Sequence, residues 1–195
     1  MSEWQPTRWT APFTEADEKA FADPLIVNSH FGLPLPMAER AFSISLNEAG
    51  LTNVHNGGFR PHYFGNTVAM QYIKQRYPDS WIWDERYRFA ATATRIQNRQ
   101  FKRAQDHFIR IMGDSRIREV VARGKAIGLD PGGREIGRPD VAIYCPNEKI
   151  QWRFMEIKIS SRGDKLRPIQ EQWLRLLSDI FGEGASIELE LVKEQ

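Results

Sequence analysis

The chain has 195 residues, of which 41% are hydrophobic and 27% are charged, and its formal net charge is +2. This length suits one domain of ordinary size, or one domain with an extension, and the composition is that of a folded protein with a buried core. The nearly balanced charge does not by itself indicate a nucleic-acid-binding protein.

The chain also lacks the features of an exported or membrane-anchored protein. Its single cysteine, Cys145, excludes an internal disulfide and favours a reducing compartment. No apolar stretch is long enough to cross a membrane, and residues 1–6 do not resemble a Sec-type signal peptide. We therefore expect a cytoplasmic protein that is not associated with a membrane.

Residues 1–80 predict helices that are separated by irregular segments. The spacing of apolar residues predicts helices over residues 14–22, 36–50 and 66–77. Asn66 is expected to cap the last of these helices, and Pro78 to end it. We expect the remainder to be irregular, including the stretch before residue 14.

The middle of the chain predicts one strand and two helices. Hydrophobic residues alternate with charged ones from Trp81 to Phe89, which predicts a half-buried strand. An apolar stripe at helical spacing predicts a long helix that ends at Gly113, and a shorter helix follows until Gly124.

The last third of the chain predicts an α/β core. In chain order we expect two strands, a helix and a final strand, over residues 140–145, 151–160, 168–181 and 187–192. A turn over residues 146–149 joins the first two strands in a hairpin. Strands and helices in this order are typical of an α/β fold.

Basic residues gather in the segment 95–138, which has eleven lysines and arginines against five acids. A local basic excess is suited to a phosphate backbone. Our candidates for nucleic-acid contacts here are Arg123, Lys125 and Arg138. The alternative is that these side chains lie on solvated helix faces.

Two acids and a lysine stand in the most strand-like part of the sequence. Asp140 begins the first strand of the hairpin, and Glu156 and Lys158 lie inside the apolar second strand. Residues two apart on a strand share a face, and the hairpin brings Asp140 to the end of the second strand where Glu156 and Lys158 lie. We therefore expect two carboxylates and an ammonium group in one cluster.

This cluster has the chemistry of a phosphodiester-hydrolysing site. Two neighbouring carboxylates repel each other unless a proton or a cation separates them. Mg²⁺ prefers oxygen ligands and is commonly bound by one or two carboxylates together with substrate phosphate. The lysine would orient the attacking water or stabilise the charge that builds on the phosphate. The alternative is a solvated ion pair on an exposed strand.

The order of these residues resembles a known family of nucleases. Pro139-Asp140 followed by Glu156-Ile157-Lys158 is similar to the PD-(D/E)xK signature. The next segment resembles the virus-type replication-repair nuclease family, VRR-NUC, through Asp164-Lys165-Leu166, Gln170 and Trp173-Leu174. The link over residues 159–163 is longer than is usual in that family.

The resemblance implies an α/β fold with a restriction-endonuclease-like core, a small mixed sheet flanked by helices, over residues 111–195. Residues 1–110 would form a mainly helical N-terminal extension of unknown role. The family further implies dependence on Mg²⁺ or Mn²⁺, with Asp140, Glu156 and the Ile157 backbone carbonyl as metal ligands. Lys158 would be the catalytic lysine, and Gln170 a further catalytic residue on the helix that faces the site.

Other candidates surround this set. Glu119 is our candidate for an additional metal ligand, with Glu135 as the second choice. Glu119 is equally well explained as an exposed helix residue that is paired with Arg116 or Arg123. The loop before the last helix offers candidates for phosphate contacts, which are Arg162, Lys165 and Arg167.

Our first hypothesis is a metal-dependent DNA endonuclease, and the family implies branched or flapped substrates. Its context would be repair or recombination, a phage or mobile element, or a DNA-degrading toxin. The alternatives are a nuclease-fold binding or assembly subunit without catalysis, and an RNase on the same core. DNA is the expected partner, a protein partner of the N-terminal half is a further candidate, and the sequence indicates no oligomeric state.

Overall fold

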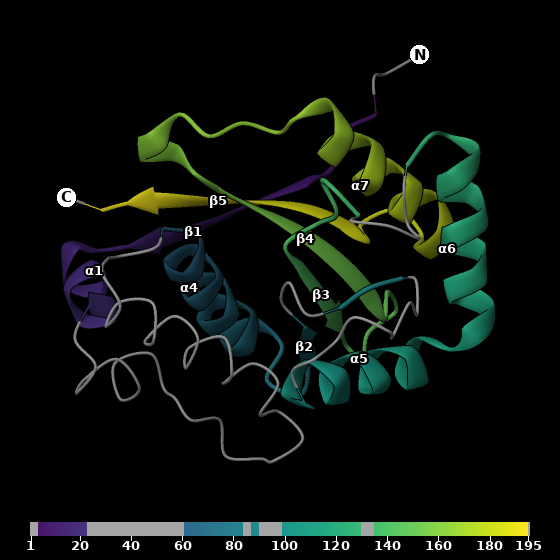
Figure 1. Cartoon of the computed structure of the whole chain (residues 1–195). Coiled ribbons are helices and arrows are strands. Elements are labelled where there is room, and N and C mark those ends of the chain that lie inside the picture. The colour runs from purple at the N-terminus through teal and green to yellow at the C-terminus, as the bar shows by residue number, and fades with distance from the viewer. Residues whose placement is uncertain (1–3, 23–60, 84–86, 90–98, 130–134, 195) are drawn as a thin grey trace.

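A five-stranded mixed sheet with helices on both faces forms the fold (Figure 1). The structure, a computed structural model, describes residues 4–22, 61–83, 87–89, 99–129 and 135–194. This architecture confirms the predicted α/β class with a mixed sheet and flanking helices.

The strands lie in the order β1-β5-β4-β3-β2. Their bounds are β1 Thr7–Phe13, β2 Trp81–Trp83, β3 Val141–Tyr144, β4 Trp152–Ile159 and β5 Ser186–Lys193. The pairs β1–β5 and β4–β5 are parallel, whereas β2–β3 and β3–β4 are antiparallel. β3 and β4 form the predicted hairpin, and β4 is buried along its whole length at the centre of the sheet.

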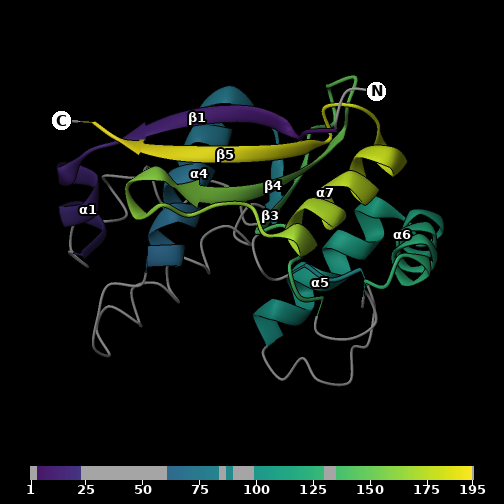
Figure 2. The ribbon, with the colours of Figure 1, turned by 90° about the horizontal axis from the view of Figure 1, so that it is seen from above.

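The two faces of the sheet pack against different helices (Figure 2). Helices α1 (Glu15–Ala22) and α4 (Pro61–Arg76) cover the face to which Ile157 and Leu189 point. On the face of Phe154 lie α5 (Arg99–Met112), α6 (Asp114–Ala126) and α7 (Pro168–Phe181). Within the described ranges, no helix combines the length and the hydrophobicity that a membrane crossing requires.

Helix α4 approaches the sheet closely at Gly65. A Cβ atom at this position would lie 3.5 Å from Ile157 Cγ2 and 3.7 Å from Leu191 Cδ1, which is ordinary van der Waals contact, so alanine would fit there and only a side chain larger than alanine would press on the sheet. The contact holds α4 against the same β4 segment that carries Glu156 and Lys158 on its other face. Packing on one face thus fixes the backbone that presents the polar residues on the other.

The structure corrects three predictions in the N-terminal half. The strand predicted from Trp81 to Phe89 is shorter, because β2 ends at Trp83 and residues 87–89 are not in a strand. Residues of β1 were expected to be irregular, but they form an edge strand; an edge strand tolerates Pro12, which obscures the strand pattern. Asn66 is not a cap, because α4 begins earlier, at Pro61, and Asn66 is buried inside it. The helix predicted over residues 36–50 lies outside the described residues.

The sheet also crosses the boundary that was predicted between residues 110 and 111. β1 and β2 precede that boundary, yet β1 pairs with β5 and β2 pairs with β3. The described part of the N-terminal half therefore supplies both edge strands of the sheet. Helices α5, α6 and α7 and strands β3, β4 and β5 lie where the sequence predicted them, with small differences at their ends.

Candidate functional site

One row of charged residues runs across the sheet on the face of Phe154. Arg8 of β1 is paired in register with Glu188 of β5, and Glu188 is paired with Glu156 of β4. The register of β3 and β4, continued by one residue beyond Val141, brings Asp140 level with Glu156. Three strands and the residue that precedes β3 therefore contribute to the row. In the neighbouring row, Lys158 is paired with Glu190.

Glu156, Lys158 and Gln170 form a closed set of hydrogen bonds. Lys158 Nζ lies 3.0 Å from Glu156 Oε1 and 3.1 Å from Gln170 Oε1, and Gln170 Nε2 also donates to Glu156 Oε1. All three side chains are buried. Gln170 reaches the strand because it lies in the first turn of α7, where its Oε1 also accepts the backbone N–H of Arg167 at 3.0 Å.

Asp140 lies on the other side of Glu156, at the start of β3. Its Oδ2 accepts the backbone N–H of Ile157 at 2.9 Å. Backbone groups of residues two apart on a strand face the same neighbouring strand, and Met155 pairs with Val141 of β3. The backbone of Ile157 therefore faces the end of β3, where the Asp140 carboxylate lies.

Burial makes the two acids unusually easy to protonate. The pKa of Glu156 is raised to about 8, first by burial and then by the Asp140 carboxylate, and Lys158 offsets only part of this effect. Burial also raises the pKa of Asp140, against the hydrogen bond from Ile157. Without a cation, this pair favours at least one protonated carboxyl group at neutral pH.

The two carboxylates fit a divalent cation. Glu156 Oε2 is buried and has no hydrogen-bond partner among the described residues, and a buried oxygen without a partner is costly. No group of three or more His, Cys, Asp or Glu side chains converges on a metal position in the described ranges. Two carboxylates are nevertheless a common protein contribution to a Mg²⁺ site, which keeps several waters.

The segment before Asp140 is fixed against α7. Gly137 has a φ of 78°, and a Cβ atom there would lie 2.7 Å from Ile169 Cγ2, so both conformation and space require glycine. Trp173 Nε1 donates to the Ile136 carbonyl at 3.1 Å. Asp140 is therefore held in place relative to the helix that carries Gln170.

A buried ion pair supports the same segment from the other side. Arg138 Nε lies 3.0 Å from Glu135 Oε2, and the guanidinium stacks 4.0 Å from the centre of the Tyr87 ring. Tyr87 in turn donates to the Pro139 carbonyl at 2.6 Å, and Glu135 Oε1 accepts the backbone N–H of Phe89 at 2.9 Å. Arg138, which we expected to contact nucleic acid, thus has its side chain buried between Glu135 and the Tyr87 ring.

Other predicted residues lie apart from the carboxylate pair. Glu119, our candidate for an additional metal ligand, lies on α6 and forms ion pairs with Arg116 at 3.0 Å and Arg123 at 3.6 Å. Arg123 also lies 3.6 Å from Asp179, and Lys125 is exposed on the same helix. Helix α6 lies at the opposite end of the molecule from the turn that follows β4 (Figures 1 and 2).

The loop before α7 lies beside the site. Lys165 and Arg167 are exposed on this loop, whereas the side chain of Arg162 lies outside the described part of the structure. Asp164 Oδ1 lies 3.7 Å from Lys158 Nζ. The resemblance to the nuclease family gives only the order of Lys158 and Asp164 along the chain. The structure shows that the two side chains are also close in space.

Three charged residues that lie across the sheet from Glu156 and Lys158 were not anticipated from the sequence, namely Arg8, Glu188 and Glu190. The sequence could have predicted two of them. Glu188 and Glu190 alternate with Ile187, Leu189 and Leu191, so the two acids must share one face of β5. Arg8 carried no such signal, because the strand that contains it was not predicted.

Comparison with known proteins yields a distant structural likeness. No protein-family model matches the chain, and no curated protein matches it significantly. The chain is similar to the protein in a crystal structure described as paFAN1 bound to 2nt 5′ flap DNA with gap, with a TM-score of 0.37 and 13% identity. The match covers 100% of this chain and 39% of that chain, so this chain spans less than half of that protein. A likeness of this size carries no information on activity.

Proposed function

We propose that the protein is a metal-dependent nuclease that hydrolyses phosphodiester bonds in DNA. The observation that carries this proposal is the juxtaposition of Asp140, Glu156 and Lys158, with Gln170 bonded to two of the three. Two carboxylates and an ammonium group at one point suit the hydrolysis of a charged ester better than they suit a packed core. The raised pKa of both acids supports the same conclusion, since perturbed carboxyl groups are frequent at functional sites.

Asp140 and Glu156 would hold Mg²⁺ or Mn²⁺, together with the Ile157 carbonyl. When bound, the ion supplies Lewis-acid polarisation of the phosphate and lowers the pKa of its water. Glu156 Oε2 is the oxygen that is available for this role, because Oε1 is engaged with Lys158 and Gln170. The hydrogen bond from Ile157 holds the Asp140 carboxylate toward Glu156.

Lys158 would act on the phosphate or on the attacking water. Its ammonium group is fixed by three oxygens, from Glu156, Gln170 and Asp164, and is therefore oriented before the substrate arrives. Gln170 keeps that geometry, because it accepts from Lys158 while it donates to Glu156. The ammonium group is thus held rigidly at the point where negative charge would build on the phosphate.

The test is cleavage of plasmid, linear duplex, branched DNA and RNA, each with Mg²⁺, with Mn²⁺ and with a chelator. We expect cleavage of DNA that requires the metal and is abolished in Lys158→Ala and Glu156→Gln. Lys193→Ala is the matched control, because Lys193 forms an exposed ion pair with Glu18 away from the site. Calorimetric titration with Mn²⁺ gives a second readout, in which the wild type binds the ion and Glu156→Gln does not.

The substrates also separate the alternatives. Metal-dependent cleavage of RNA alone would assign an RNase. Metal binding without cleavage of any substrate would favour a nuclease-fold binding subunit. Equal cleavage by the wild type and Lys158→Ala would show that the activity comes from a different site or a contaminant, and the proposal would be withdrawn.

A further inference from the structure

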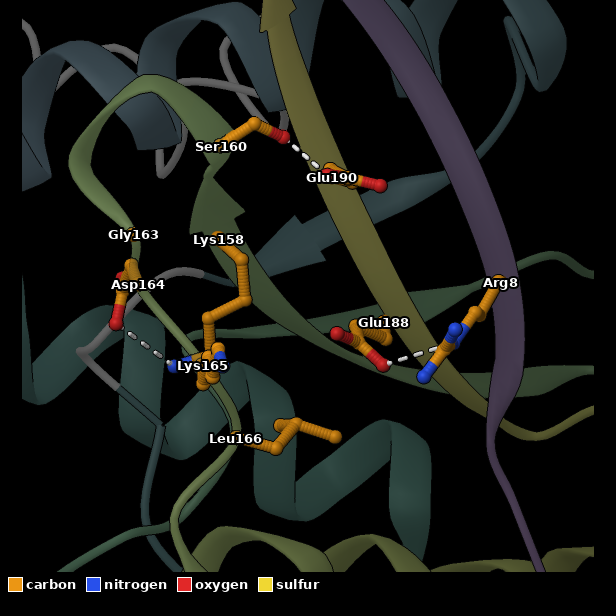
Figure 3. A pocket seen from close by; sticks show the side chains of 9 residues that line it. All are labelled: Arg8, Lys158, Ser160, Gly163, Asp164, Lys165, Leu166, Glu188 and Glu190. Carbon is orange, nitrogen blue, oxygen red and sulfur yellow. Dashed lines mark hydrogen bonds and ion pairs between the residues drawn. The ribbon is translucent and has the colours of Figure 1, made fainter.

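A cavity of about 400 Å³ opens next to Lys158 (Figure 3). It lies over β5 and β1, which are on the side of β4 away from β3. β5 forms its floor with Glu188 and Glu190, and Arg8 of β1 forms one wall. The loop that precedes α7 forms the opposite wall with Asp164 and Lys165. The cavity therefore lies between the N-terminal strand and the C-terminal loop.

The carboxylates in this cavity are already engaged. Glu190 accepts a hydrogen bond from Ser160, Asp164 pairs with Lys158, and Glu188 Oε2 lies 3.4 Å from Arg8 Nε. Figure 3 shows all three contacts between residues that line the cavity. Each acid in the cavity thus has a hydrogen-bond donor or a cation beside it.

Each of the two walls carries a cation, Arg8 on one side and Lys165 on the other. Lys165 is exposed and has no hydrogen bond or ion pair with any described residue. The Arg8 side chain is 70% exposed, and only its Nε approaches Glu188, so the terminal nitrogens of the guanidinium remain for another partner. Available donors from two opposite walls define a site for an anion.

We propose that this cavity binds the phosphate next to the scissile one in a nucleic-acid strand, with Arg8 and Lys165 as its ligands. This inference rests on the proposed nuclease function, because it takes the strand to pass over Lys158. The strand would run from the carboxylate pair, past Lys158, into the cavity. Arg8 and Lys165 would position the substrate and would not take part in the chemical step.

Binding tests the cavity separately from cleavage. Fluorescence anisotropy with labelled single-stranded and duplex DNA measures affinity in chelator, which removes the metal that the proposed cleavage requires, so that the substrate survives. We expect Arg8→Gln and Lys165→Gln each to weaken binding about tenfold, as removal of a charge-assisted hydrogen bond does. Each should also reduce the slope of log affinity against log salt by about 0.7 to 0.9. Arg8→Lys should retain part of the affinity, and Lys19→Gln on α1 is the matched control.

Glu188→Gln gives a result of opposite sign. It removes a negative charge from the cavity and releases Arg8, so it should strengthen binding, whereas removal of a merely structural ion pair would not. Circular dichroism and thermal unfolding confirm that each variant is folded, which the exposure of Arg8 and Lys165 favours.

Unchanged affinity and salt slope in both Arg8→Gln and Lys165→Gln would overturn the proposal. Weaker binding in Glu188→Gln would also overturn it, since the Arg8–Glu188 pair would then act as a structural unit. A titration with inorganic phosphate that depends on both residues, without an effect on DNA affinity, would show a site for a free anion instead. If Lys158→Ala removes cleavage but the cavity variants behave as the parent, the nuclease proposal stands and only the cavity proposal fails.

Discussion

Arg138 and Glu135 form an ion pair whose side chains are 7% and 0% exposed, three residues apart in the segment that leads into Asp140. Glu135 has a φ of 49°, in the left-handed region that non-glycine residues rarely adopt. Such a conformation costs of the order of 1 to 3 kcal/mol and persists where the surroundings impose it. The pair therefore fixes an unfavourable backbone next to a candidate catalytic residue.

Glu135→Gln should destabilise the protein strongly. It retains an oxygen that can accept the Phe89 N–H, but it leaves the buried Arg138 charge without its carboxylate. Breaking one partner of a buried pair typically costs about 3 to 5 kcal/mol. Urea unfolding followed by circular dichroism measures the change in the free energy of unfolding.

Glu119→Gln is the matched control for that variant. Glu119 also forms an ion pair three residues away, with Arg116 at 3.0 Å, but on the exposed face of α6. Exposed pairs contribute about 0 to 1 kcal/mol, so this variant should unfold close to the wild type. Equal effects at the two positions would contradict the supporting role of the buried pair.

The stability of the metal-free protein should fall as the pH rises. The pKa of Glu156 is about 8 in the folded state and 4.5 in the unfolded reference, so the folded state binds more protons between these values. The free energy of unfolding then decreases with pH in this window, by up to about 1.4 kcal/mol per pH unit for one group. The raised pKa of Asp140 acts in the same direction. Thermal unfolding in chelator, from acid to mildly alkaline buffer, checks the trend.

Glu156→Gln should flatten this pH dependence, because it removes the carboxyl group that releases the proton. Added Mg²⁺ should raise the unfolding temperature of the wild type there, because an ion that binds only the folded state stabilises it. The same ion should have little effect on Glu156→Gln. Glu171→Gln, on the exposed side of α7, should follow the wild-type curve. A wild-type curve that rises across this range would mean that Glu156 ionises without the penalty of burial.

Gln170→Ala should lower kcat more than it changes KM. The variant removes the bonds from Gln170 to Lys158 and Glu156, so the ammonium group loses part of its fixed position. A misplacement of this kind costs up to about 100-fold in rate without weaker substrate binding. Steady-state cleavage assays give both constants, and Gln172→Ala, an exposed position on the same helix, is the control. A rise in KM alone would instead place Gln170 in substrate binding.

Periodicity explains which parts of this fold were predictable. β4 and α7 have strong apolar patterns, and their ends were predicted closely, so the hairpin and the Glu156–Lys158 pair followed from side-chain alternation. β1 is an edge strand with a weak pattern, and its parallel partner β5 lies at the far end of the chain. No local rule relates Arg8 to Glu188, because only the completed sheet brings them together. The burial of Arg138 depends likewise on Tyr87, which is distant in sequence.

Charge reversal on α6 tests whether local basic excess indicates the path of the nucleic acid. We expect Arg123→Glu combined with Lys125→Glu to leave DNA affinity close to that of the parent, measured in the Lys158→Ala background. Arg123 is held by Glu119 and Asp179, and α6 lies at the opposite end of the molecule from the turn after β4. Removing one phosphate-binding side chain from a duplex DNA complex changes the salt slope by about 0.9, so an unchanged slope would exclude both residues from the DNA-binding surface. A decrease of the salt slope by twice this amount would place the nucleic-acid strand over α6. The DNA-binding surface would then extend well beyond the Arg8–Lys165 cavity.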